Sequence, residues 1–157
     1  MPAIKREDKK LSPEFVALEQ CRTTTGENND CAIKVITLLT GQPYNSVLRA
    51  ANERGRVPGN GTPWNIIMDL FDLYGYSVKL VEDDEMLPRK PDGTLICTTI
   101  TTHHPKRFNK LWANGANYML LTCRKRHVAA VMDGTLHDWT VGSSKRVNGV
   151  YQIIQKP

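Results

Sequence analysis

A cysteine, a histidine and an aspartate are the residues of this chain best placed to do covalent chemistry together: Cys31, His127 and Asp138. Cys31 follows the polar stretch 21–30, predicted to be a loop, and begins the apolar run 31–40, whose spacing predicts a helix. A thiol at a helix N-terminus faces unbonded backbone N–H groups and the positive end of the helix dipole, which lower its pKa from about 8.5. Cys31 is therefore a candidate nucleophile, and its own N–H a candidate oxyanion donor. The alternative is a small residue that only fills the first helical turn.

His127 and Asp138 lie on two predicted strands that form a hairpin. The segment HVAAVMDGTLHDW alternates on both sides of Asp133-Gly134, a strong signal for a two-residue turn. This turn pairs Ala129 with Asp138, so the Asp138 side chain shares a face with His127, one diagonal step away. The carboxylate can then orient the imidazole toward a thiol. His137 is predicted on the opposite face and is a poor candidate. A surface histidine and a turn acid are the bland alternatives.

The remaining pattern predicts the elements that must position these residues. Helices are expected from Pro13 to about Gln20 and over 31–40, 44–55, 62–75 and 103–115. Short β-branched runs predict strands at 77–81, 94–100, 117–123, 127–132, 135–141 and 149–155. Helices followed by a run of mostly antiparallel strands predict an α+β fold.

The segment NNDCAIKVITLLTG, followed far downstream by HVAAVMDGTLHDW, resembles papain-like cysteine peptidases. It is similar in particular to the small bacterial and phage forms related to bacteriocin-processing peptidases, in element order over residues 25–155. The resemblance implies N-terminal helices packed on a mostly antiparallel sheet, and a peptidase, amidase or isopeptidase acting on a protein or peptide through an acyl-enzyme. Cys31 would be its nucleophile, His127 its general base and acid, and Asp138 the residue that orients the imidazole.

The chain departs from this pattern where such peptidases place a glutamine, six residues before the nucleophile, to complete the oxyanion hole. That position holds Thr25. Asn29, or Asn28, is the predicted replacement, because each carries an amide N–H donor. The alternative is a catalytically inactive papain-like scaffold that binds a host protein or nucleic acid.

Composition bounds the remaining possibilities. The 157 residues favour one domain over 11–157 after a flexible basic arm at 1–10, and we expect a monomer. No run approaches the ~20 apolar residues of a membrane span, and the charged start lacks a signal peptide, so we expect a cytoplasmic protein, in the host cytoplasm if it is phage-encoded. The net charge of +5 comes from scattered basic residues, which makes nucleic acid a weaker candidate partner. The four cysteines form no Cys-x-x-Cys pair, and we expect neither a metal nor a cofactor.

Overall fold

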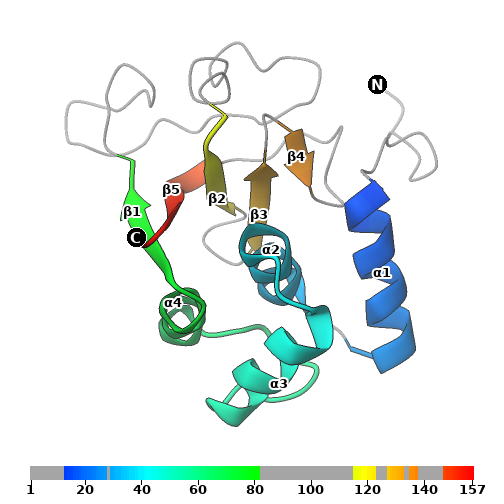
Figure 1. The fold of residues 1–157 in the computed structure, drawn as a ribbon. Helices are drawn as coiled ribbons and strands as arrows, with labels where there is room; N and C mark the ends of the chain where they lie inside the picture. The colour runs from blue at the N-terminus through cyan, green and yellow to red at the C-terminus, as the bar shows by residue number, and fades with distance from the viewer. Residues whose placement is uncertain (1–12, 28, 82–114, 123–126, 133–134, 138–146) are drawn as a thin grey trace.

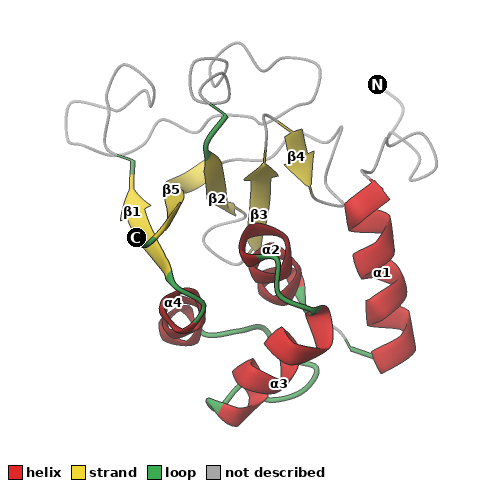
Figure 2. Cartoon of the chain, in the orientation of Figure 1, coloured by secondary structure: helices red, strands yellow, loops and turns green. Residues whose placement is uncertain are grey.

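The computed structural model describes residues 13–27, 29–81, 115–122, 127–132, 135–137 and 147–157. Within these ranges the chain forms helices first and then mostly strands (Figures 1 and 2). The helices are α1 (Pro13–Thr25), α2 (Cys31–Thr40), α3 (Tyr44–Glu53) and α4 (Trp64–Leu73). The strands are β1 (Tyr76–Leu80), β2 (Asn117–Thr122), β3 (His127–Met132), β4 (Thr135–His137) and β5 (Val147–Gln155).

The described strands form one antiparallel sheet in the order β1-β5-β2-β3-β4. The last strand, β5, lies between β1 and β2 and so joins the first strand to the rest. Helix α2 packs against β3, and α4 packs against β1. The predicted α+β class is confirmed. None of the four described helices is long and apolar enough to cross a membrane.

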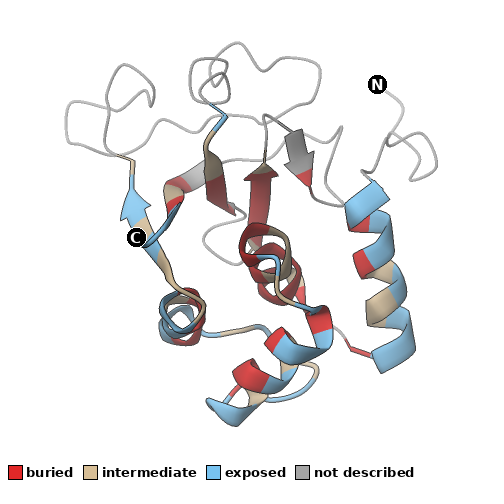
Figure 3. Cartoon of the chain, viewed as in Figure 1, coloured by how far each residue is buried: buried red, intermediate tan, exposed pale blue. Residues whose placement is uncertain are grey.

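Helix α2 is the buried centre of the molecule (Figure 3). Most of its side chains are buried, and it contacts α1, α3, α4, β2 and β3. Its apolar residues pack with Met119, Leu121, Val128 and Ala130 of the sheet in one core cluster. The helix ends at Gly41, whose φ of 73° is left-handed and whose N–H donates to the Thr37 carbonyl at 3.0 Å.

The hairpin predicted around Asp133-Gly134 has the expected register. Ala130 pairs with His137, Val131 with Leu136 and Met132 with Thr135. The strands expected at 77–81, 117–123, 127–132 and 149–155 are present with bounds shifted by no more than two residues. The arm at 1–10, the strand at 94–100 and the helix at 103–115, apart from Gly115, lie outside the described residues.

The loop predicted from residue 21 is wrong, because α1 continues to Thr25. Each of the three threonine hydroxyls at its end donates to the carbonyl four residues earlier, at 2.9–3.1 Å, so these side chains bond to their own helix. The helix ends at Gly26, where φ is 68°. The loop before Cys31 is therefore shorter than the composition indicated.

We expect Gly41→Ala to lower the free energy of unfolding by about 1–2 kcal/mol, because a Cβ strains a left-handed backbone. A Cβ at Gly41 meets no atom within 4 Å, so the cost is one of conformation alone. Gly61→Ala is the control, since its surroundings are equally open and its φ lies outside the left-handed range. Urea denaturation measures both variants. Equal losses of stability would contradict this account of the end of α2.

Candidate active site at the start of helix α2

Cys31 is the first residue of α2 and is half-buried against the core cluster. Like Cys21, it is a thiol and forms no disulfide. Asp30 occupies the N-cap position, but its side chain makes no capping hydrogen bond. The backbone N–H groups of the first turn are therefore not capped by Asp30, although aspartate is among the best capping residues. This is the placement of a cysteine that the sequence predicted.

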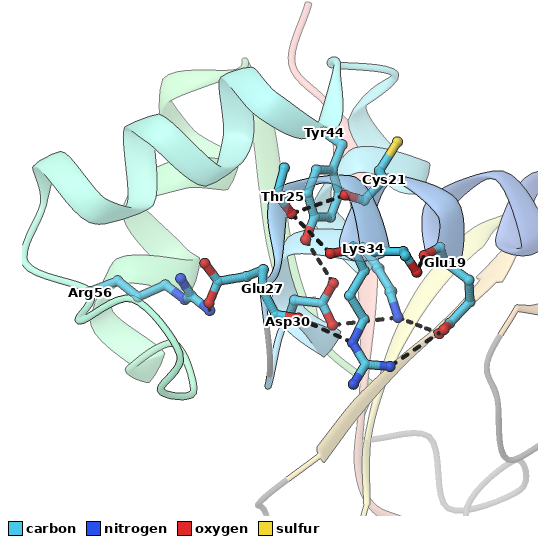
Figure 4. A network of polar contacts seen from close by, with 10 residues as sticks. Glu19, Cys21, Thr25, Glu27, Asp30, Lys34, Tyr44 and Arg56 are labelled. Carbon is cyan, nitrogen blue, oxygen red and sulfur yellow. Dashed lines mark hydrogen bonds and ion pairs between the residues drawn. The ribbon is translucent and has the colours of Figure 1, made fainter.

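The Asp30 carboxylate instead binds two partners inside the protein. The Tyr44 hydroxyl donates to Oδ2 at 2.7 Å, and the Lys34 ammonium lies 3.4 Å from Oδ1. Figure 4 shows Lys34 between the carboxylates of Asp30 and Glu19, with Nζ 2.5 Å from Glu19 Oε1. The Lys34 and Asp30 side chains are each 5% exposed. This network joins α1, α2 and α3 through Asp30, the residue directly before Cys31.

Tyr44 is held as a permanent hydrogen-bond donor to this network. Burial raises the pKa of its phenol, and the hydrogen bond to Asp30 and the charge of that carboxylate raise the pKa further. The phenol therefore keeps its proton throughout the neutral range. The Lys34 ammonium also lies 5.0 Å from the centre of the Phe15 ring, a cation–π contact with α1.

A second set of bonds holds the residues that lead into Cys31. Glu27 Oε1 accepts from Arg56 Nη2 at 2.9 Å and from the Gly59 N–H at 2.6 Å. Asn29, whose φ of 51° is left-handed, donates from Nδ2 to the Gly59 carbonyl at 2.9 Å. The side chains of Glu27 and Asn29 thus form hydrogen bonds with both backbone polar groups of Gly59.

The structure describes one of the two predicted oxyanion donors, Asn29. Asn29 uses one amide N–H on Gly59 and carries a second, so its role in an oxyanion hole stays a prediction. Asn28 lies outside the described residues. Thr25, at the position of the expected glutamine, donates its hydroxyl to the carbonyls of Cys21 and Arg22. Its side chain is turned back onto α1.

In Figure 1, α2 lies against β3. His127 is the first residue of β3 and is half-buried. Alternation along β3 places its Cβ with Ala129 and Val131, on the face away from Val128 and Ala130 of the helix-covered core. A contact between His127 and Cys31 must therefore form at the end of the strand. That contact stays a prediction, and its third member, Asp138, lies outside the described residues.

His137 is the histidine on the helix-covered face. It pairs with Ala130, and it is 5% exposed. The sequence correctly placed it opposite His127, but gave no sign of which face the helices cover. Both alternating sets of β3 are apolar, so the pattern did not distinguish the two faces.

Among the described residues no group of three histidine, cysteine, aspartate or glutamate side chains is arranged to hold a metal ion. No protein-family model matches the chain, and neither a curated protein nor a solved structure does.

We expect Tyr44→Phe to lower the free energy of unfolding by about 1–3 kcal/mol, because the buried Asp30 carboxylate loses a donor. Tyr74→Phe is the matched control. It also removes a phenol hydroxyl whose pKa burial raises, but no hydrogen bond joins that hydroxyl to the described residues. Chemical denaturation compares the two variants. If both changes cost the same, the Tyr44–Asp30 bond does not organise the start of α2.

Proposed function

We propose that this chain is a papain-like cysteine hydrolase that cleaves an amide, thioester or isopeptide bond of a protein or peptide. The observation that carries the proposal is the position of Cys31, the first residue of a buried helix whose N-cap side chain is bonded elsewhere. The dipole of α2 then acts on the Cys31 sulfur and favours the thiolate. The buried helix before an antiparallel sheet and the packing of α2 on β3 support the papain-like architecture.

The reaction follows from these positions. The Cys31 thiol gives its proton to His127, and the thiolate attacks the carbonyl carbon to form a tetrahedral oxyanion. The Cys31 N–H and the second amide N–H of Asn29 donate to that oxyanion. His127 then protonates the leaving group, and the acyl group stays on sulfur until water, deprotonated by His127, releases it. Asp138 orients the imidazole and balances its positive charge.

An inactive scaffold is the competing function, and two observations favour it. Thr25 is turned back onto α1, and Asn29 already uses one amide N–H on Gly59. An oxyanion hole with the Cys31 N–H alone would lose about 10²–10³ in rate for a missing donor. Such a protein would use its surface to bind a host protein or nucleic acid instead.

We expect iodoacetamide at pH 7 to alkylate Cys31 about tenfold faster than Cys21, with an inflection of the Cys31 rate below about pH 8. Cys21 is the matched control, because it is also a half-buried thiol against the same core but lies within α1. Peptide mapping by mass spectrometry follows all four cysteines at once. Equal, slow labelling of Cys21, Cys31, Cys97 and Cys123 would favour the inactive scaffold.

We expect His127→Asn to slow alkylation of Cys31 at pH 7 by about tenfold or more, because the thiolate loses its imidazolium partner. Asp138→Asn should slow it less, and His137→Asn should leave it within about twofold once folding is verified by circular dichroism. His137 is the stringent control because it lies on the face that α2 covers. A larger effect from His137→Asn would assign the base to β4.

A further inference from the structure

We propose that Glu27 is a positioning residue, which holds the loop 56–61 as a rigid wall against the segment that carries Cys31, and that this wall receives the acyl part of a peptide substrate. The inference rests on the proposed function and names how that site holds its substrate. It is carried by a cluster of buried polar contacts that the chemistry at Cys31 does not itself use.

One oxygen of Glu27 bonds two parts of the loop. Oε1 accepts from the Arg56 guanidinium and from the Gly59 N–H, while Asn29 donates to the carbonyl of the same glycine. Both polar groups of that residue are therefore satisfied by residues two and four positions before Cys31. Because these hydrogen bonds hold Gly59 to the residues before Cys31, the loop keeps one position relative to the nucleophile even when no ligand is bound.

The Glu27–Arg56 ion pair is buried, and its members also bond to residues outside the loop. The Arg56 side chain is fully buried, and its Nη1 donates to Asn52 Oδ1 on α3 at 3.1 Å. The backbone of Glu27 exchanges two hydrogen bonds with Arg22 of α1, at 3.2 Å each. Burying an ion pair gains little stability over apolar packing, so this pair matters more for the geometry it fixes. The Glu27–Arg56 pair and its hydrogen bonds hold α1, α3 and the loop 56–61 in fixed positions relative to Glu27, four residues before Cys31.

The outer surface of the loop is open. A Cβ built at Gly59 or Gly61 meets no atom within 4 Å, and Val57 is 58% exposed. Glycines without neighbouring side chains let an extended chain approach the backbone closely. An apolar side chain beside them offers contact area. An open wall bonded to Glu27 and Asn29, four and two residues before Cys31, would help to place the substrate within bonding distance of the sulfur, where a misplacement of 1 Å can cost about 10²-fold in rate.

Two thiol probes separate positioning of the wall from reactivity of the sulfur. Iodoacetamide is small and reports on the Cys31 thiolate alone, whereas tripeptide vinyl sulfones with varied side chains must also lie along the wall. We expect Glu27→Gln to lower the ratio of the peptide-probe rate to the iodoacetamide rate at Cys31 by about tenfold or more. Asp72→Asn is the control, because it neutralises a carboxylate paired with Lys156 at the surface, and its ratio should stay within about twofold.

A second measurement follows the hydrogen bond from the Gly59 N–H to Glu27 directly. Amide hydrogen exchange at Gly59 should accelerate in Glu27→Gln and not in Asp72→Asn, because only the first change weakens the acceptor of that N–H. If neither rate changes, or if both rates fall by the same factor, the ratio stays constant and the positioning role is overturned. Fast iodoacetamide labelling of the unchanged chain without reaction of any peptide probe would overturn the wall and leave the hydrolase standing. Slow labelling of Cys31 by both probes would overturn both proposals.

Discussion

The buried ammonium of Lys34 is the constraint on which the rest of the structure depends. A lysine is almost never this deeply buried without partners, and here it lies between the carboxylates of Glu19 and Asp30. Asp30 is bonded there and makes no capping hydrogen bond to the helix that it precedes. The interaction that holds α2 in the core therefore also withholds the usual side-chain cap from its first turn, where Cys31 begins the helix.

Two buried carboxylates lie within the four residues before Cys31, and both have cationic partners. Asp30 is paired with Lys34, and Glu27 with Arg56, whose side chain is fully buried. Unpaired anions near a thiol oppose its ionisation, because a neighbouring negative charge raises the thiol pKa. Because each carboxylate is paired, neither opposes the effect of the α2 dipole that the proposed function invokes at the sulfur. The same two pairs hold the neighbouring helices and the loop 56–61, so stability and electrostatics have one origin.

Local signals in the sequence predicted much of this fold, while its polar contacts were not predictable. The helix at 31–40 followed from apolar spacing and Gly41, and the register of β3 and β4 followed from Asp133-Gly134 alone. The end of α1 was not predicted because its threonines have low helix propensity, a weak signal that tertiary context overrides here. The Glu27–Arg56 pair joins residues 29 apart, and no pattern in one sequence links them.

For the candidate site, the sequence predicted its members better than their surroundings. Cys31 opens its helix as expected, and His127 opens a strand that α2 contacts. The side of β3 that faces the helices was not predictable, because a strand buried on both faces shows no alternation.

The face on which each histidine lies has a chemical consequence. On the helix-covered face the Cys31 sulfur could meet an imidazole across the core, whereas His127 can approach it only past the end of β3. A site formed at the end of a strand is open to substrate from solvent. An imidazole enclosed in the core, as at His137, is not. The hydrolysis that we propose needs both substrate and water to enter, and that requirement favours His127 over His137 as the proposed base.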